Sequence, residues 1–242
     1  MKSNYINYDF EKSRGRIDSI LDASDTSYEE VDSIPSRDRL TFNNGFYVKC
    51  TSMFVDIRKS TELTTKYKRP TLAKIYRTFI SEVVAVVNGN SDCSEIFIQG
   101  DCVWAVFNTP YKVDIDSVFS TSAEVSSVID TMNCKFKKKG IDPINVGIGI
   151  DYGRALMIKA GYSGSAINDV VWMGDVVNQA AKIARFGNRE WYDYELMISS
   201  AIYNNLNEHN KKLMSYSNYR SCYHGNIVNT GMNDWLKENG CK

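Results

Sequence analysis

The sequence lacks any apolar run that approaches the ~20 residues needed for a helix to cross a bilayer. Its longest apolar runs, Val83–Val87 and Val103–Phe107, are far shorter. The first residues, Met1 to Tyr5, also contain no apolar core of the kind found in a secretory signal peptide. We therefore expect a protein with no membrane span and a cytoplasmic location.

An excess of charge of one sign is also absent. The 29 Lys and Arg residues balance the 29 Asp and Glu residues, so the formal net charge is zero. Proteins that coat nucleic acid with their whole surface carry a strong basic excess, and we expect no nucleic acid partner here. A local basic pocket is compatible with the balance. The 242 residues, 43% hydrophobic and 24% charged, are typical of a globular chain with one large domain or two small ones.

Grouped cysteines and histidines are missing as well. The six cysteines are scattered without a CxxC pair, and the two histidines, His209 and His224, lie apart from every motif discussed below. A disulfide framework or a cysteine–histidine metal site needs tighter grouping. We therefore expect six reduced thiols.

The first 45 residues differ from the rest of the chain. Residues 8–23 are rich in charge and carry Ile17, Ile20 and Leu21 at helical spacing, which predicts a helix. Residues 24–36 are acidic and polar and end in Ile34-Pro35, which favours a linker. We expect an N-terminal helix and linker over 1–45 and one patterned domain over 46–242.

The patterned domain alternates strands and helices. Apolar spacing and turn residues predict strands over 47–57, 94–98 and 102–107, helices over 60–67, 70–86, 113–136 and 174–187, and a hairpin of 144–150 and 155–160. In this prediction Ser60 or Thr61 caps the first helix, Pro70 lies in the first turn of the second, and Asp151-Tyr152-Gly153 forms the hairpin turn. This order predicts an α+β fold, with helices over one face of a mainly antiparallel sheet.

Two aspartates occupy positions suited to metal binding. Asp56 ends an apolar strand, and Asp101 follows Gly100 in the turn between two apolar strands. Carboxylates at adjacent strand ends can hold divalent ions, and Ser60 and Thr61 follow at a helix start, where free N–H groups can receive phosphate. Together these residues indicate two-metal chemistry on a nucleotide. The alternative is that each aspartate only caps a strand or forms a turn.

Four segments resemble the motifs of class III nucleotidyl cyclases, in the same order. They are the two metal-site motifs, the central hairpin, and the segment with the ribose and transition-state residues, found here as 54–61, 100–107, 146–153 and 174–182. Residues 34–47 further resemble the pyrimidine cyclases of Pycsar antiphage defence systems. The resemblance implies a ferredoxin-like catalytic domain with an antiparallel-rich sheet, active as a homodimer whose subunits share the active sites.

The resemblance also implies roles for individual residues. Asp56, Asp101 and the Ile57 carbonyl match the ligands of two divalent ions, Mg²⁺ or Mn²⁺, and Asn178 matches the asparagine that orients the ribose. Lys182 lies where most members have an arginine that stabilises charge on the α-phosphate, and a lysine lacks that residue's planar fork. Arg185, nearly one turn later, is a candidate to share this role. The alternative is that Lys182 and Arg185 belong to a solvated helix face.

The positions that read the base in purine cyclases are apolar here. Phe97 lies where those enzymes have Lys or Glu, and Val171 lies where they have Asp, Thr or Cys. Neither side chain can form a hydrogen bond, so neither purine-reading pair is present. We predict a base pocket that includes Phe97, Val171 and the adjacent Trp172, with Phe97 narrowing it toward a pyrimidine. The alternative is that all three are core residues.

These features predict a pyrimidine cyclase that converts CTP into 3′,5′-cyclic CMP and pyrophosphate as a second messenger in antiphage defence. The preference for CTP rests on overall resemblance, and UTP is the next candidate. Alternatives are an adenylate or guanylate cyclase and an inactive nucleotide-binding domain. An RNA-recognition module is disfavoured because its exposed aromatic pair is not evident. Lys211 and Lys212 are weak candidates for the triphosphate-binding lysine that the family often supplies from its C-terminal part.

Overall fold

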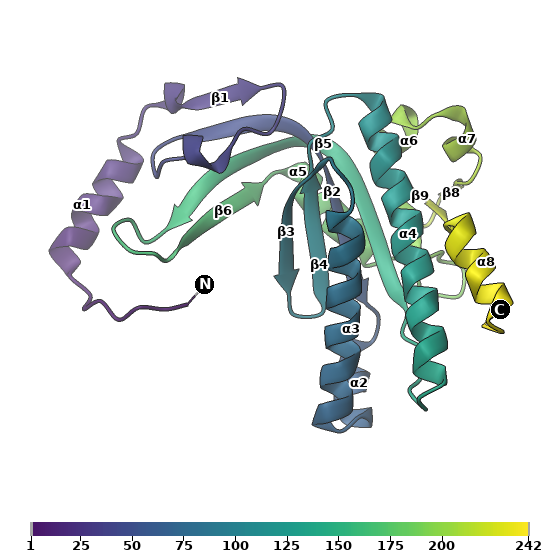
Figure 1. The fold of residues 1–242 in the computed structure, drawn as a ribbon. Coiled ribbons are helices and arrows are strands. Elements are labelled where there is room, and N and C mark those ends of the chain that lie inside the picture. The colour runs from purple at the N-terminus through teal and green to yellow at the C-terminus, as the bar shows by residue number, and fades with distance from the viewer. Residues whose placement is uncertain (1, 242) are drawn as a thin grey trace.

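The computed structural model describes residues 2–241 and contains a nine-stranded sheet flanked by helices (Figure 1). Its helices are α1 (Phe10–Leu21), α2 (Ser60–Lys66), α3 (Arg69–Asn88), α4 (Lys112–Lys137), α5 (Asp175–Ala184), α6 (Ser200–Asn205), α7 (Glu208–Lys211) and α8 (Thr230–Glu238). Its strands are β1 (Tyr28–Val31), β2 (Gly45–Ile57), β3 (Cys93–Gln99), β4 (Cys102–Phe107), β5 (Val146–Gly161), β6 (Asn168–Met173), β7 (Leu196–Ile198), β8 (Ser215–Ser217) and β9 (Cys222–Gly225). The predicted α+β class is confirmed. Within the described residues, no helix combines the length and the apolar character that a membrane crossing requires.

The sheet is mostly antiparallel, as predicted. Its strand order is β3-β4-β2-β5-β7-β9-β8, with β1 added beside β2 and β6 beside β5. Among residues 2–241 only the β1–β2 and β5–β7 pairs are parallel. The long strands β2 and β5 pair over 13 positions and form the centre of the sheet.

Helices cover both faces of the sheet, so the expectation of helices on one face is wrong for α5. Met53 and Val55 of β2 belong to the core beneath α3 and α4, whereas Phe54 between them packs with α5 on the opposite face. On β5, Gly149 lets α5 approach the strand backbone, because a Cβ there would lie 2.3 Å from the Ala180 carbonyl oxygen. The sequence pattern could not show this second layer, since a glycine contributes nothing to an apolar repeat.

The two helices that follow β2 begin differently from each other. Pro70 lies in the first turn of α3, as predicted, and α3 buries Ile75, Phe79 and Val83 at four-residue spacing. By contrast, the predicted cap of α2 is wrong, because the N-cap is Lys59 and no side chain caps the helix. Lys59 has a left-handed backbone conformation (φ 53°) that turns the chain sharply out of β2.

The predicted hairpin over 144–160 is also wrong, because β5 runs without a break from Val146 to Gly161. Asp151 pairs with Ser52 and Gly153 with Cys50, so the Asp-Tyr-Gly sequence lies inside the ladder. Gly153 is not among the glycines with positive φ, a conformation that a tight hairpin turn requires. The turn occurs later, through Gly164 (φ 86°), and leads into β6.

The segment expected to be a linker contains a strand. Tyr28–Val31 forms β1, which pairs in parallel with β2 from Gly45 to Val48. Val31 and Ile34 pack against a buried cluster that includes Leu40 and Phe46, and this apolar contact holds the segment on the sheet. The division of the chain at residue 45 stays a prediction, although β1 makes the N-terminal segment part of the sheet.

One disulfide is present, so the expectation of six reduced thiols is wrong for two cysteines. Cys134 near the end of α4 is bonded to Cys241, which follows α8. The remaining cysteines (Cys50, Cys93, Cys102 and Cys222) are free. The bonded pair is separated by 107 residues, and only the packing of α8 beside α4 brings the two sulfurs together.

Removing this disulfide is expected to destabilise the fold. A bond that closes so long a loop restricts the unfolded chain, and its loss typically costs about 2–5 kcal/mol. The Cys241→Ser variant should therefore unfold at lower urea concentration than the wild type. Adding a reductant should lower the wild-type midpoint toward that of the variant and leave the variant unchanged. A variant with the wild-type urea midpoint would show that the disulfide contributes nothing to the stability of the fold.

Candidate active site

The structure brings the two predicted metal ligands together at one edge of the sheet. Asp56 is the penultimate residue of β2 and pairs with Cys102, the neighbour of Asp101 in chain order. The Ile57 backbone N–H donates to the Asp101 carbonyl oxygen at 3.3 Å, which ties the β3–β4 turn to the end of β2. Asp56, Ile57 and Asp101 therefore lie close together at this edge of the sheet, and their role as metal ligands stays a prediction.

The surroundings of Asp56 disfavour its charged form. Partial burial raises the pKa of the Asp56 carboxyl above its usual value, and the charge of Asp101 raises it further. The charges of Arg58 and Arg185 act in the opposite direction but do not cancel the shift. A bound cation would stabilise both carboxylates in this position, since an opposite charge within a few ångströms favours the ionised form.

Arg58 links the end of β2, the strand that contains Asp56, to the end of α5. Its guanidinium pairs with the Asp56 carboxylate and also donates to the Asp56 carbonyl oxygen at 3.3 Å. A third contact, from Nη1 to the Arg185 carbonyl oxygen at 3.0 Å, reaches the residue that follows α5. The Arg58 side chain is only 12% exposed. No role for Arg58 could be predicted from the sequence, because adjacency to Asp56 cannot show that the side chain turns inward.

Tyr76 of α3 is a second site residue that the sequence analysis missed. Its hydroxyl is hydrogen-bonded to Ser60, and burial followed by the charge of Asp101 raises its pKa. Helical spacing placed Tyr76 on the apolar side of its helix, which indicated only a core residue. The phenol is amphipathic, so the same side chain packs with the core and presents its hydroxyl to the carboxylates.

Ser60 and Thr61 open α2 four and five positions after Asp56. Ser60 is half-buried and Thr61 is exposed. Their place beside the carboxylates agrees with the predicted phosphate contact. Phosphate binding by these two residues stays a prediction.

The three predicted catalytic residues of the α5 segment are exposed. Asn178 and Lys182 lie within α5, and Arg185 is its C-cap. The spacing of four and three residues places them along one side of the helix. The opposite side is buried against the sheet through Val176, Ala180, Ile183 and Ala184. Asn178 and Lys182 are therefore free to contact a second molecule.

The predicted base-pocket residues are not gathered into one pocket of the chain. Phe97 is half-buried and stacks on Trp104, with ring centroids 4.1 Å apart, and Trp104 stacks in turn on Phe54 at 5.0 Å. Val171 is 37% exposed, whereas Trp172 is 5% exposed and lies in the cluster against which Phe97 packs. Val171 and Trp172 point to opposite sides of β6, so their joint role in base binding stays a prediction.

The residues present fit a divalent ion that is shared with a substrate. Within residues 2–241 no group of three or more His, Cys, Asp or Glu side chains could enclose a metal. Mg²⁺ is commonly bound by one or two carboxylates together with water and substrate phosphates, rather than by a complete protein cage. The oxygen donors of Asp56 and Asp101, with the Ile57 carbonyl, are of this type.

Comparison with known proteins identifies the family. Residues 43–225 match the family model described as the adenylate and guanylate cyclase catalytic domain. The chain belongs to this family. The cyclase is also 41% identical to a uridylate cyclase of Gulbenkiania mobilis, over 99% of this chain and 100% of that protein. A uridylate cyclase of Treponema porcinum is 38% identical over 98% of this chain and 84% of that protein.

Solved structures show the same fold. The adenylyl cyclase CyaB from P. aeruginosa aligns with 71% of the cyclase and 85% of its own chain, at TM-score 0.61 and 21% identity. A bacterial light-regulated adenylyl cyclase aligns with 79% of the cyclase and 98% of its own chain, also at TM-score 0.61. At these identities the likeness supports the fold alone. The uridylate cyclases, unlike the family model, also align with the segment that contains α1 and β1.

Proposed function

We propose that the cyclase converts UTP into 3′,5′-cyclic UMP and pyrophosphate. The observation that carries this proposal is the similarity, over nearly the whole chain, to two proteins named uridylate cyclase. The apolar side chains of Phe97 and Val171 support a pyrimidine, because neither can hydrogen-bond to a purine edge. The CTP preference expected from the sequence is not confirmed. CTP remains the second candidate, since these two side chains do not distinguish the pyrimidines.

In the proposed mechanism the chain's residues position the substrate and stabilise charge. Asp56 and Asp101, with the Ile57 carbonyl, would hold two Mg²⁺ or Mn²⁺ ions, which when bound would acidify the ribose 3′-hydroxyl and neutralise the triphosphate. Asn178 orients the ribose so that the 3′-oxygen lies in line with the α-phosphorus. The 3′-oxygen gives its proton to solvent and bonds to the α-phosphorus, while the bond to the α,β-bridging oxygen breaks and pyrophosphate leaves with that oxygen. Lys182 donates to the α-phosphate oxygens as their charge increases. Arg185 supports Lys182 from the end of the helix.

The exposure of Asn178 and Lys182 supports a site shared between two copies of the chain. Each copy supplies Asp56 and Asp101 to one site and the exposed side of α5 to the other. Such an interface closes with twofold symmetry and gives a homodimer with two equivalent sites. The product, a cyclic pyrimidine nucleotide, would act in the cytoplasm as a second messenger of antiphage defence.

A direct assay tests the proposed function. The purified protein is incubated with Mn²⁺ and each of the four ribonucleoside triphosphates, and the products are identified by mass. Cyclic UMP should be the main product, and Asp101→Asn should abolish it. Predominant cyclic CMP would transfer the proposal to CTP, and cyclic AMP alone would refute a pyrimidine cyclase. If no nucleotide is cyclised and Asp56→Ala leaves nucleotide binding unchanged, the inactive binding domain is the better description.

A further inference from the structure

Two arginines beyond the end of α5 have no acidic partner within residues 2–241. Arg185 and Arg189 are exposed, and neither forms an ion pair among these residues. The arginines that are paired with a carboxylate are Arg14, Arg37, Arg39, Arg58, Arg154 and Arg220. Arg16, Arg69 and Arg77 also form no ion pair within the described residues, but Arg185 and Arg189 follow one another closely at the end of α5. Two unpaired guanidinium groups near one helix end form a candidate anion site.

The loop that contains Arg189 packs closely against the edge of the sheet where Asp56 and Asp101 lie. Gly187 approaches Gly147 of β5 so closely that a Cβ on Gly187 would lie 2.7 Å from the Gly147 Cα. Gly147 itself pairs with Asp56 of β2. Asn188 Nδ2 donates to the Val146 carbonyl oxygen at 2.9 Å, which adds a hydrogen bond to the glycine contact. The loop therefore lies beside the strand end that holds Asp56.

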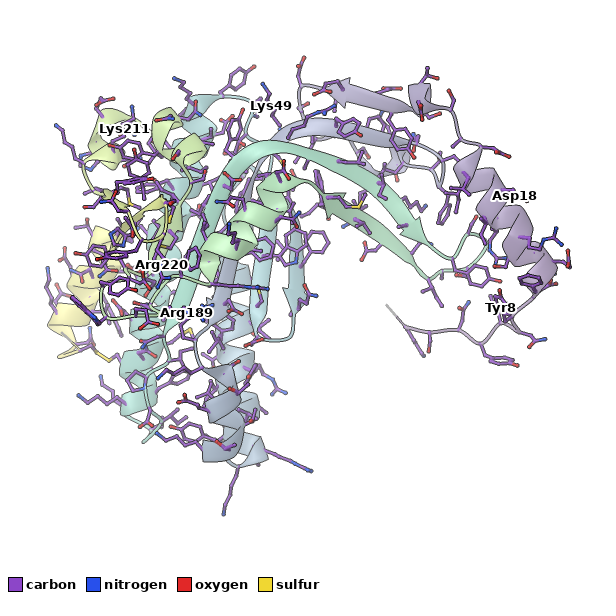
Figure 2. All side chains as sticks on the ribbon, turned by 180° about the vertical axis from the view of Figure 1, so that it is seen from behind. Tyr8, Asp18, Lys49, Arg189, Lys211 and Arg220 are labelled. Carbon is purple, nitrogen blue, oxygen red and sulfur yellow. A yellow bond between two sulfur atoms is a disulfide. The ribbon has the colours of Figure 1, made fainter. Side chains whose placement is uncertain are left out.

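The same loop is held rigidly on its other side. The Asp193 side chain is fully buried and accepts two hydrogen bonds from Arg220, at 2.9 and 2.6 Å. The Arg220 guanidinium also lies over the ring of Phe186, 4.7 Å from its centroid, and the Arg189 backbone N–H donates to the Phe186 carbonyl oxygen at 3.2 Å (Figure 2 labels both arginines). Asn188 has φ 50°, and its backbone N–H donates to the Tyr194 carbonyl oxygen at 3.2 Å. A loop fixed at both sides presents Arg189 in a defined place, which lowers the entropic cost of binding.

The charges at this edge suit a metal-bound polyphosphate. Arg58 neutralises Asp56, and the charge of Arg185 also acts on that carboxylate. The charge of Arg189 acts on Arg58, which places its guanidinium within electrostatic range of the same pair. A metal–triphosphate complex offers cations to the two carboxylates and oxygen anions to the free guanidinium groups, which can bind phosphate in bidentate fashion.

The two candidate triphosphate-binding lysines, Lys211 and Lys212, lie elsewhere in the chain. Lys211 is in α7 and pairs with Glu208 at 2.9 Å. In Figure 1 α7 lies at the upper right of the molecule and α2 at its lower end, and α2 begins only four residues after Asp56. Lys211 and Lys212 are therefore far from Asp56 of their own chain.

We propose that Arg189 binds the β- and γ-phosphates of the nucleotide at the Asp56–Asp101 site of its own chain. The inference rests on the proposed function, because it assumes a nucleoside triphosphate substrate. Arg189 is then a binding residue for the polyphosphate, distinct from Lys182, which acts on the α-phosphate. Its contribution belongs to substrate binding more than to the chemical step.

Arg189→Gln tests the proposal, with Arg69→Gln as the matched control because Arg69 is another exposed arginine with no ion pair within the described residues. Affinity for inorganic tripolyphosphate with Mn²⁺ is measured by calorimetry. Arg189→Gln should weaken it about 10- to 100-fold, the usual effect of losing hydrogen bonds to a charged group. Arg189→Lys should recover part of the affinity, and Arg69→Gln should bind as the wild type does. Equal affinities in all four proteins would overturn the proposal.

Steady-state kinetics separate this role from a structural one. Arg189→Gln should raise the KM for the nucleotide and change kcat much less, because the lost contact is present before and during the reaction. A fall in kcat at unchanged KM would contradict the binding of the β- and γ-phosphates by Arg189. If the wild type cyclises no nucleotide but binds tripolyphosphate in an Arg189-dependent manner, the proposed function fails and the polyphosphate site is supported. Thermal melting of each variant verifies that it is folded.

Discussion

Asp101→Asn is expected to reduce cyclic nucleotide formation by at least about a thousandfold, because loss of metal-based charge stabilisation removes several kcal/mol from catalysis. The substitution keeps the size of the side chain and its suitability for a turn, and it removes the negative charge that a divalent ion requires. Asp101 is half-buried in the β3–β4 turn, so the fold should tolerate the change. The measurements are kcat/KM with Mn²⁺, Mn²⁺ binding by electron paramagnetic resonance, and thermal melting.

Two comparisons make this result specific. Asp22→Asn removes an exposed carboxylate at the C-cap of α1 and should leave activity and Mn²⁺ binding unchanged. Asp56→Asn should lose activity as Asp101→Asn does, but it should also lose about 1–3 kcal/mol of stability. The reason is that Arg58, only 12% exposed, would lose its carboxylate partner. Activity near the wild-type level in Asp101→Asn would exclude this carboxylate as a metal ligand.

Local patterns were sufficient to place the two carboxylates. An apolar strand that ends in Asp56 and a tight turn that contains Asp101 are each readable within a few residues. The two carboxylates come together because the β3–β4 hairpin lies next to β2. Its turn, which contains Asp101, therefore lies at the end of β2, where Asp56 is found. The α+β class was predictable for the same reason, since it depends on the order of elements with strong periodicity.

The errors arose where long-range pairing overrides a local signal. The Asp-Tyr-Gly sequence at 151–153 has turn character, but these residues pair in turn with Ser52, Thr51 and Cys50 along the 13-position ladder between β2 and β5. A continuous ladder satisfies more backbone groups than a turn at that point would. The disulfide was missed for a related reason, because Cys134 and Cys241 meet only after α8 has packed beside α4.

Side-chain direction was the other quantity that the sequence did not contain. Arg58, Tyr76 and Arg189 all lie near motif residues or within apolar repeats, yet only the folded chain shows where each one lies relative to the carboxylates. Arg58 turns inward to Asp56, and the Tyr76 hydroxyl reaches Ser60. Arg189 is placed by the contact between two glycines, Gly147 and Gly187, that are 40 positions apart. Such contacts depend on tertiary packing and not on spacing along the chain.

The second large effect is expected when two inactive variants are mixed. Asp56→Ala and Asn178→Ala should each be inactive alone, because every site of either homodimer contains one lesion. After subunit exchange at equal amounts, half of the dimers are mixed if association is random. In a mixed dimer one site carries both lesions, and the other carries none if Asp56 and Asn178 of a site come from different chains. Recovery should therefore reach about a quarter of the wild-type rate, as twofold symmetry requires.

The control for this experiment is a mixture of Asp56→Ala with Asp101→Asn, whose lesions fall on the same half of the proposed site. Every site in that mixture contains a damaged carboxylate pair, so no activity should return at any ratio. Recovery in the test mixture should be greatest at equal amounts of the two variants. A test mixture as inactive as the control would place Asp56 and Asn178 of one site in the same chain. The exposed Asn178 and Lys182 on α5, turned away from the sheet that carries the carboxylates, support the shared site.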